Sequence, residues 1–229
     1  RQVAVIVSRP NWETDENERE IELVDVASGT RRTFTHARQG PSTPRWSPDG
    51  AYLAFLAKDP KTRQDQIFVA PMRGGDPQRV TDNPQGVDSY AWSPDGKHIA
   101  FVAQDPPLNA EAIKAHNKVF RVTDGHFLLD KEVAPWHLWM VPAAGGTARR
   151  LTQGKFSLGT ESGSTTTPAW RPDGGAIAFT TFPGPYWAPS FRSTIGEVTL
   201  ADGAMHTLVE AQGASYFSYA PAGGRSAFQ

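Results

Sequence analysis

The sequence contains no cysteine, so it can form no disulfide bond and supply no cysteine nucleophile. Its formal net charge is only −1, with acidic and basic residues interspersed, so we expect neither a nucleic acid nor an anionic membrane surface as a partner. No apolar run is long enough to cross a bilayer, and helical patterning is nearly absent. These absences exclude several broad classes of protein and favour a globular chain built from strands.

The sequence also lacks the Gly-x-Ser-x-Gly pentapeptide that carries the nucleophile of α/β-hydrolases. The segment 154–159 (GKFSLG) has the wrong spacing and lies in a connection between repeats. No alternation of strands and helices is present that could build a hydrolase sheet and hold a catalytic triad. We therefore predict that residues 1–229 contain no catalytic residue and no catalytic domain.

Six histidines raise the question of a metal site, and their positions argue against one. Three of them fall in or beside regular strands, namely His36, His98 and His206. The other three share one insertion, at spacings that match no familiar zinc-site pattern, namely His116, His126 and His137. We predict that the chain holds neither a metal ion nor another cofactor.

Glycine (21 residues) and proline (19 residues) are abundant, and both occur in a repeated pentapeptide. Its copies are 46–50 (WSPDG), 92–96 (WSPDG) and 170–174 (WRPDG), with an eroded copy at 219–223 (YAPAG). Proline presets the backbone for a turn, aspartate can hydrogen-bond its own backbone, and glycine takes the left-handed conformation that closes the turn. We therefore interpret one set of repeat residues as structural: Trp46, Asp49, Gly50, Trp92, Asp95, Gly96, Trp170, Asp173 and Gly174.

A second pattern recurs between these pentapeptides. Residues 21–35 align without gaps to residues 67–81, and residues 138–152 and 195–209 follow the same template. Each copy is a short apolar strand, a turn containing glycine and a second strand, which is the pattern of a hairpin. Because the WSPDG segment joins two further strands, each unit has four antiparallel strands, A to D. Four strands in about 40–45 residues are typical of a propeller blade, so the sequence predicts an all-β propeller.

We expect a single propeller domain over residues 1–229, with about four blades plus partial blades. Its segments are a blade remnant at 1–36, blades at 43–82, 87–152 (with an insertion at 104–137) and 167–210, and a partial blade at 215–229. The chain begins after an A strand, with Val3–Val7 as a B strand, and stops after a B strand, which favours truncation of a longer propeller. In the alternative, residues 215–220 complete the first blade and close a four-bladed ring. Exposed blade edges in the open form predict self-association.

The A–B and C–D turns lie on one face of a propeller and keep a constant length here, whereas the loops on the other face vary. The variable loops are Ser8–Glu20, Lys58–Gln66, Gln104–His137, Gln153–Thr167 (rich in Ser, Thr and Gly) and Thr181–Thr194. Binding tends to reside in loops carried by a rigid scaffold, so we expect this face to be the functional one. Tolerated surface insertions are the alternative for any single loop. The acidic run 13–18 is interpreted as a solvated loop.

The longest loop and its counterpart in the next blade have distinct patterns. Residues 109–116 predict one or two helical turns, and residues 118–129 predict an extra hairpin around Asp124-Gly125. Residues 182–187 (FPGPYW) predict a rigid aromatic loop, interpreted first as a cover over blade edges and second as a binding platform. The candidate residues that face a substrate or partner are Glu111, His116, His126, Glu132, Trp136, Tyr186 and Trp187.

The WSPDG hairpin, followed by the LW, GG and RRLT pattern of residues 138–152, resembles the repeat of the prolyl oligopeptidase family and of TolB-like periplasmic propellers. The segment 118–152 is similar to one branch of that family, the bacterial dipeptidyl and acylaminoacyl peptidases. This resemblance implies a seven- or eight-bladed propeller that precedes an α/β-hydrolase domain with a Ser-Asp-His triad. It also implies that the propeller screens peptide substrates by size and helps to hold the N-terminal part of the peptide.

The resemblance leads to two hypotheses. In the first, the chain is the non-catalytic propeller portion of a serine peptidase, with a peptide substrate and a hydrolase domain as its partners. In the second, it is a stand-alone TolB-like propeller that acts as a protein-interaction scaffold. A lactonase-type enzyme is a third hypothesis, disfavoured because no set of metal-binding carboxylates converges in the pattern. The chain starts at Arg1 and not at a methionine, which fits a removed export signal and favours a periplasmic or secreted protein over a cytoplasmic one.

Overall fold

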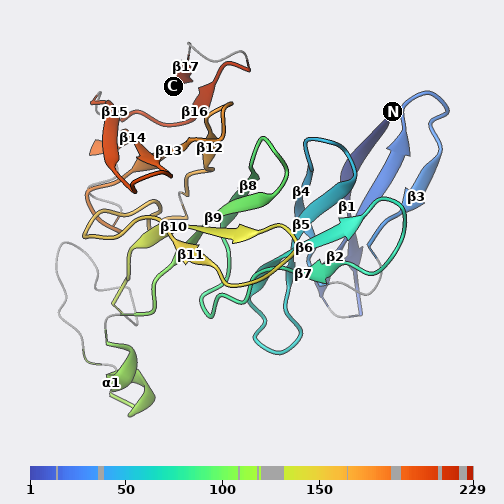
Figure 1. Cartoon of the computed structure of the whole chain (residues 1–229). Coiled ribbons are helices and arrows are strands. Elements are labelled where there is room, and N and C mark those ends of the chain that lie inside the picture. Colours follow the sequence, from blue (N-terminus) through green and yellow to red (C-terminus); the bar gives the residue numbers. More distant parts are fainter. Residues whose placement is uncertain are drawn as a thin grey trace.

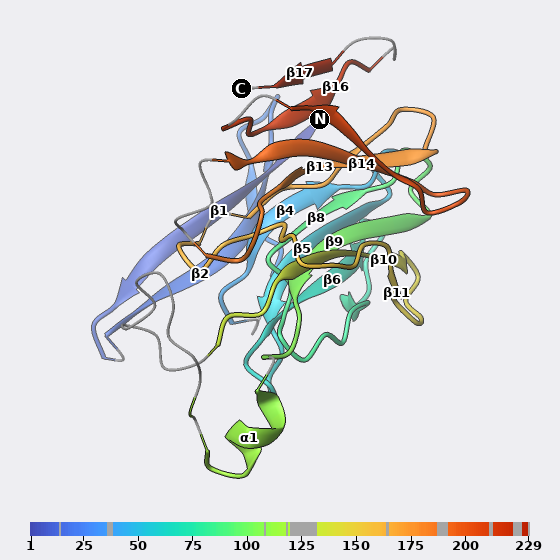
Figure 2. The ribbon, with the colours of Figure 1, turned by 90° about the vertical axis from the view of Figure 1, so that its left-hand side faces the viewer.

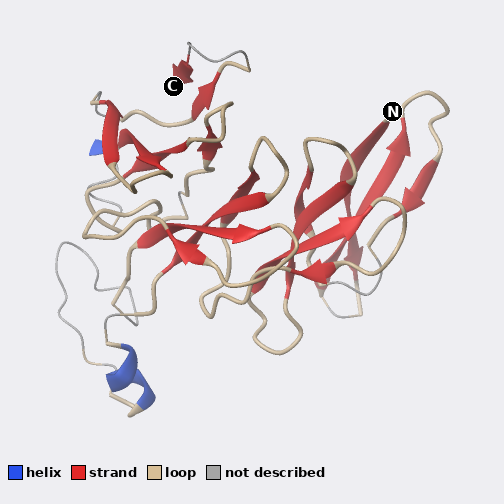
Figure 3. Ribbon diagram, in the orientation of Figure 1, coloured by secondary structure: helices blue, strands red, loops and turns tan. Residues whose placement is uncertain are grey.

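The regular secondary structure of the described residues consists almost entirely of β-strands, which long and short loops connect, as Figure 3 shows. A computed structural model describes residues 1–229 except 14, 36–38, 108, 118, 120–131, 164, 187–191, 211–212, 222–225 and 229. Three four-stranded antiparallel sheets follow one another along the chain, with a three-stranded sheet before them and a two-stranded sheet after them. In the described part of the chain, no helix is long and apolar enough to span a membrane.

The five sheets are numbered here in chain order. Sheet 1 contains β1 (Gln2–Asn11), β2 (Glu16–Asp25) and β3 (Arg31–Thr33). Sheet 2 contains β4 (Ser42–Trp46), β5 (Tyr52–Lys58), β6 (Asp65–Pro71) and β7 (Gln78–Arg79). Sheet 3 contains β8 (Ser89–Trp92), β9 (His98–Gln104), β10 (Trp136–Pro142) and β11 (Arg149–Arg150), with the short helix α1 (Ala110–Lys114) between β9 and β10. Sheet 4 contains β12 (Ala169–Trp170), β13 (Ala176–Thr181), β14 (Thr194–Thr199) and β15 (Met205–Val209), and sheet 5 contains β16 (Phe217–Tyr219) and β17 (Ser226–Phe228).

Short polar contacts shape the turns between the first two strands of the four-stranded sheets. In sheet 2, Asp49 Oδ1 accepts the hydroxyl of Ser47 at 2.6 Å, and it also accepts a backbone N–H two residues later at 3.0 Å. Asp95 makes the same pair of contacts in sheet 3, at the same distances. In sheet 4, Arg171 replaces the serine and donates from Nε to Asp173 Oδ1 at 2.8 Å. These hydrogen bonds to the charged form lower the pKa of all three carboxyl groups.

The threonine at the end of the C–D hairpin has a repeated role in three sheets. Its hydroxyl oxygen accepts the backbone N–H of a buried strand residue at 2.9 Å, with the pairs Ile21 to Thr35, Ile67 to Thr81 and Leu138 to Thr152. In sheet 4 a valine, Val209, takes this place, and the pairing register shifts between Ile195 and Gly196. The recurring apolar-Thr pair in the sequence therefore satisfies a buried backbone donor that the short D strand leaves unpaired.

The sheets pack face to face in chain order. Along β5, alternate side chains face opposite neighbours, because successive residues of a strand point to opposite sides. Phe55 packs in a core with Ile21 of sheet 1, whereas Leu56 packs in a separate core with Tyr90 and Phe101 of sheet 3. Equivalent cores join sheet 3 to sheet 4 and sheet 4 to sheet 5. Figure 1 shows the result as a fan of sheets, and β4, β8, β12 and β16 each lie at one edge of their sheet.

The aromatic residue of the repeat links neighbouring sheets. The indole Nε1 of Trp92 donates to the backbone oxygen of Arg45 at 3.1 Å, and the indole of Trp170 donates to the backbone oxygen of Ala91 at 3.2 Å. In the eroded copy, Tyr219 donates its hydroxyl to the carboxylate of Glu197 in sheet 4. The repeat aromatic thus bonds to the preceding sheet and does more than close its own turn.

The structure corrects the prediction of a variable loop at Ser8–Glu20. β1 extends to Asn11 and β2 begins at Glu16, so most of that range is strand. Cross-strand contacts extend the hairpin: Arg9 binds Glu20 at 2.6 Å and Glu22 at 2.9 Å, and Asn11 binds Glu18 at 2.6 Å. The end of the acidic run 13–18, interpreted from the sequence as a loop, therefore belongs to β2, where Glu18 contacts Asn11 across the strands.

The ends of the chain do not form the closed four-bladed ring. Within the described residues, β16 pairs with β17, and β1 pairs only with β2, so sheet 5 does not complete sheet 1. Figure 1 shows these two sheets on opposite sides of the fan. The helical turn expected at 109–116 corresponds to α1, whereas the hairpin expected around Asp124-Gly125 lies outside the described residues. The division of the chain into blades stays a prediction.

Candidate functional site

The two ends of the sheets differ in how much their connections vary. At one end, the A–B turns of sheets 2, 3 and 4 are equal in length, at residues 47–51, 93–97 and 171–175. At the other end, the B–C connections of the same sheets are unequal, at residues 59–64, 105–135 and 182–193. Figure 2 shows α1, which belongs to the longest of them, standing away from the sheets. We call this second end the loop end.

A cleft of about 660 Å³ opens at the loop end between sheet 4 and sheet 5. We call it the hydroxyl cleft, because serine and threonine dominate its lining. Its lining residues are Gly163, Thr165, Thr166, Thr167, Thr180, Phe182, Ser193, Gly213, Ser215, Tyr216, Phe217 and Ser218. None of these residues carries a charge, so the cleft offers hydrogen-bonding groups and aromatic surface without an ionic group.

Hydrogen bonds within the protein hold two walls of the hydroxyl cleft in place. Thr166 Oγ1 accepts the backbone N–H of Thr180 at 2.9 Å, and Ser89 of sheet 3 donates its hydroxyl to the backbone oxygen of Thr166. On the other side, Ser193 donates its hydroxyl to the backbone oxygen of Ala214 at 2.9 Å. These contacts fix the cleft through groups that are themselves buried, so the cleft is a built part of the fold.

Other hydroxyl groups of the cleft are available to a ligand. The side chains of Thr165, Thr167 and Ser218 make no hydrogen bond to any residue that the structure describes, and all three keep accessible surface. A hydroxyl group donates one hydrogen bond and accepts up to two. These three residues can therefore pair with either N–H or C=O groups of a bound molecule.

Tyr216 stands at the rim of the hydroxyl cleft in an unusual conformation. Its φ is 52°, in the left-handed region, and 81% of its surface is exposed. Left-handed backbone is uncommon for a bulky residue and has an energetic cost. Thr43, at the corresponding position before the repeat aromatic of sheet 2, has a φ of 51°, so two copies of the repeat share this conformation. The large exposed ring, in contrast, is particular to sheet 5.

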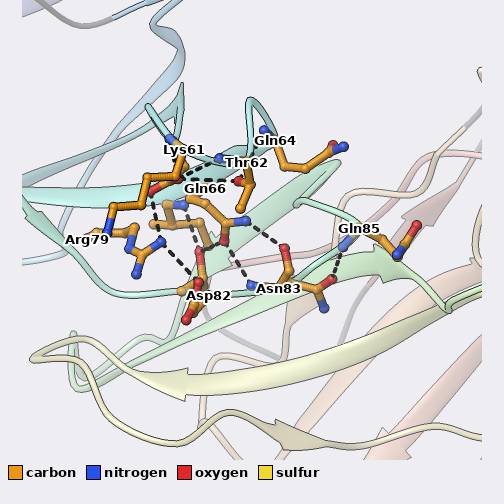
Figure 4. A network of polar contacts seen from close by, with 11 residues as sticks. Lys61, Thr62, Gln64, Gln66, Arg79, Asp82, Asn83 and Gln85 are labelled. Carbon is orange, nitrogen blue, oxygen red and sulfur yellow. Dashed lines mark hydrogen bonds and ion pairs between the residues drawn. The ribbon is translucent and has the colours of Figure 1, made fainter.

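The loop end of sheet 2 has a closed network of polar contacts, which Figure 4 shows. Arg79 binds Asp59 at 2.8 Å and Asp82 at 3.0 Å. Gln66 Oε1 accepts the hydroxyl of Thr81 at 2.8 Å and the backbone N–H of Asn83 at 3.1 Å. Because these groups satisfy one another, the network stabilises the loops of sheet 2 and leaves little for a ligand to bind.

Sheet 3 repeats this network with a histidine. His137 Nδ1 and the hydroxyl of Thr152 share a hydrogen bond at 3.1 Å, and Arg150 binds Asp105 at 2.8 Å. His137 is completely buried, and its Nε2 lies 3.8 Å from Asp105 Oδ2 with no hydrogen-bond partner among the described residues. Burial, followed by the positive charge of Arg150, lowers the pKa of His137 to about 4. The imidazole is therefore neutral at pH 7 and has no access to a substrate.

Asp88 adds a titratable group at the loop end, immediately before β8. Its Oδ2 accepts the indole N–H of Trp136 at 3.0 Å. Burial of the carboxyl group, assisted by the charge of Asp65, raises the pKa of Asp88 to about 6, against the effect of the Trp136 hydrogen bond. The residue as a whole keeps accessible surface, so solvent screens part of this effect.

The structure brings three of the sequence candidates together, Glu132, Trp136 and Tyr186, and leaves Glu111 and His116 apart from them. Glu111 is exposed on α1 and pairs with Lys114 at 2.6 Å, and His116 is exposed just after that helix. Trp136 is only 8% exposed and lies in the core between sheets 3 and 4, against which Tyr186 also packs. Glu132 is half-buried, and its charge contributes to a raised pKa of Tyr186, for which burial is the first cause. His126 and Trp187 lie outside the described residues.

The hydroxyl-bearing residues of the cleft were not singled out from the sequence. Two signals pointed toward the cleft, namely the richness of residues 153–167 in serine, threonine and glycine and the aromatic segment 182–187, which begins with Phe182. Among the described residues, no group of three or more histidine, aspartate or glutamate side chains could hold a metal ion. The arrangement is suited to binding an uncharged molecule through hydrogen bonds and aromatic contacts.

Comparisons with known proteins support the fold. No family model matches the chain. A curated relative, the uncharacterized peptidase YuxL of Bacillus subtilis, is 35% identical over 79 residues, which are 34% of this chain and 12% of the relative. TolB from Acinetobacter baumannii has a TM-score of 0.64 at 16% identity, covering 99% of this chain and 46% of its own. An acylaminoacyl peptidase from Pyrococcus horikoshii has a TM-score of 0.67 at 17% identity, covering 93% of this chain and 32% of its own.

The chain therefore spans less than half the length of each of these three proteins. Its nearly all-β architecture of four-stranded antiparallel sheets matches that of propellers. The resemblance predicted from its repeats, to the propeller portion of prolyl oligopeptidase-family peptidases and to TolB-like propellers, is confirmed.

Proposed function

We propose that this chain is the non-catalytic propeller of a prolyl oligopeptidase-like serine peptidase, which admits and positions peptides for an α/β-hydrolase domain outside residues 1–229. One observation carries the proposal: the likeness to the acylaminoacyl peptidase extends over 93% of this chain but only 32% of the peptidase. The match is thus to one portion of a peptidase chain. The absence of a Gly-x-Ser-x-Gly segment from residues 1–229 is compatible with this division of roles.

The division between the two ends of the sheets supports the same proposal. The turns of constant length are held by contacts within the repeat, so they serve the scaffold. The loop end carries both the unequal connections and the hydroxyl cleft. A propeller that admits substrate from its loop end needs variable, ligand-facing segments there and a rigid frame behind them.

The proposal is tested on the natural protein that contains these residues. We expect a fluorophosphonate probe to label a serine outside residues 1–229, and we expect short peptides to be hydrolysed faster than folded proteins. Residues 1–229 expressed alone are the matched control and should remain unlabelled. Absence of both labelling and peptidase activity in the natural protein contradicts the proposal.

A stand-alone interaction scaffold of the TolB type is the second candidate function. The observation that favours it is the likeness to TolB, which extends over 99% of this chain. This candidate predicts no fluorophosphonate labelling anywhere in the natural protein. The same labelling experiment therefore decides between the two functions.

A further inference from the structure

We propose that the hydroxyl cleft binds an extended, uncharged peptide segment that carries an aromatic or large apolar side chain. This inference rests on the proposed function, because it assigns the place where the propeller holds its peptide. The site lies between sheet 4 and sheet 5 and is distinct from the polar networks of sheets 2 and 3.

The uncharged lining of the hydroxyl cleft disfavours ionic ligands. None of the described residues that line the cleft carries a formal charge. An ammonium or carboxylate group placed there would lose hydration and gain no ion pair, which is costly for a charged group. An internal stretch of peptide, with neither terminus in the cleft, avoids this cost.

The hydroxyl groups match the polar pattern of a peptide backbone. Thr165 and Thr167 lie on the wall that leads into β12, and Ser218 lies on β16 at the opposite wall. A peptide presents N–H and C=O groups in alternation, and each hydroxyl can pair with either kind. Two walls of unengaged hydroxyl groups can therefore bind the backbone without reading its sequence.

The aromatic residues provide the apolar part of the site. Phe182 is 9% exposed and belongs to the cleft wall, while Phe217 is held edge-to-face against Tyr219 at 4.8 Å between ring centroids. Tyr216 stands exposed at the rim. Aromatic side chains pair favourably with one another in offset or edge-to-face arrangements. A volume of about 660 Å³ lies within the range of pockets that enclose small ligands and short peptides.

Tyr216 offers a substitution that separates binding from folding. Its left-handed φ of 52° is better suited to glycine than to tyrosine, so Tyr216→Gly removes the ring without adding backbone strain. Thr43→Gly is the matched control, because Thr43 has a φ of 51° at the corresponding place in sheet 2, away from the cleft. Both variants should keep the thermal unfolding midpoint of the parent chain within a few degrees.

The test is a calorimetric titration of the 229-residue chain with a tetrapeptide of one phenylalanine and three alanines, acetylated and amidated at its ends. We expect saturable binding that Tyr216→Gly weakens at least fivefold and Thr43→Gly leaves unchanged. Thr167→Val should weaken binding about threefold, whereas Thr207→Val, at an exposed threonine of β15, should leave binding unchanged. The same peptide with free, charged termini should bind at least threefold more weakly.

Several outcomes would overturn the inference. These are no binding of the capped peptide, equal binding by all four variants, or tighter binding of the peptide with charged termini. Failure of this inference is distinguishable from failure of the proposed function. A natural protein that is labelled by fluorophosphonate but whose propeller binds no capped peptide overturns the cleft assignment alone. A chain that binds the peptide through Tyr216, in a natural protein that is never labelled, overturns the peptidase proposal alone.

Discussion

Sheets 2 and 3 are built on the same contacts, yet they end in different loops. In both, an arginine of the last strand binds the aspartate that follows the second strand, at 2.8 Å: Arg79 to Asp59 and Arg150 to Asp105. The connection that follows that aspartate is short in sheet 2 and long in sheet 3, at residues 59–64 and 105–135. The frame is thus independent of the loop that it carries, which is the property that a scaffold for variable binding segments requires.

The two sheets also differ in one buried side chain. Gln66 and His137 each hydrogen-bond to the hydroxyl of a threonine, at 2.8 Å and 3.1 Å. Gln66 also donates to the backbone oxygen of Asn83 at 2.7 Å, and the backbone of Gly154, at the matching place, raises the pKa of His137 by less than burial lowers it. An amide does not titrate and an imidazole does, so the difference predicts acid sensitivity in sheet 3 and none at the matching position of sheet 2.

The largest expected effect is on the acid sensitivity of stability, and it comes from replacing His137. The pKa of His137 is about 4 in the folded chain and about 6.5 in an unfolded one, so between these values the unfolded state binds more protons. Stability is therefore lost as pH falls through this window, by about 3 kcal/mol. His137→Gln, which gives sheet 3 the residue of sheet 2, should abolish this loss. Urea unfolding at pH 7 and pH 4 measures it, and an equal loss in the variant contradicts the prediction.

The second largest effect concerns the threonine that sheets 2 and 3 share at the end of the C–D hairpin. Thr81→Val and Thr152→Val each remove the oxygen that accepts a buried strand N–H at 2.9 Å. We expect each variant to lose about 2 kcal/mol of unfolding free energy, because the donor stays buried without a partner. Urea unfolding at pH 7 measures both. A loss confined to one of the two sheets would show that their frames are not equivalent.

A smaller loss of unfolding free energy is expected when the indole hydrogen bonds between neighbouring sheets are removed. Trp170→Phe keeps most of the apolar contact and removes the hydrogen bond to the backbone oxygen of Ala91 at 3.2 Å. Trp92→Phe does the same for the bond to Arg45. Each change should cost about 1 kcal/mol, measured by thermal unfolding. If neither variant lowers the midpoint, the indole groups do not link the sheets.

The smallest effect concerns Asp88, whose place in sheet 2 is taken by Ser42. With a folded pKa of about 6, Asp88 binds more protons in the folded than in the unfolded chain between pH 4 and pH 6. Stability therefore falls as pH rises through that window, and Asp88→Asn should remove the fall. Solvent screening keeps the difference below about 1 kcal/mol. Unfolding curves at pH 4 and pH 7 measure the difference. An Asp88→Asn variant with no gain in unfolding free energy over the parent chain at pH 7 would contradict the prediction.

Local chemistry explains how much of the fold could be predicted. The turns at 47–51 and 93–97 follow from proline, aspartate and glycine within one pentapeptide, so the sequence alone indicates them. The strands of the first hairpin were predicted at Val3–Val7 and from Ile21 onward, but their extension to Asn11 and back to Glu16 was missed, because it depends on Arg9 meeting Glu20 and Glu22 across the strands. Such pairing over a distance in sequence leaves no periodic signal.

The hydroxyl cleft could not be predicted for a related reason. It forms where residues 165–167 meet residues 215–218, and these segments belong to different sheets. Neither segment carries a recognisable binding motif by itself. Only the packing of sheet 5 on sheet 4, through residues such as Ala178 and Phe217, brings the hydroxyl groups face to face.

The most direct test of the account is amide hydrogen exchange along the chain, with and without the capped tetrapeptide. We assign binding to the loop end and a scaffolding role to the turns of constant length. We therefore expect slower exchange with peptide at residues 165–167 and 215–218, and no change at residues 47–51 and 93–97. Protection at those turns, with none in the hydroxyl cleft, would contradict it.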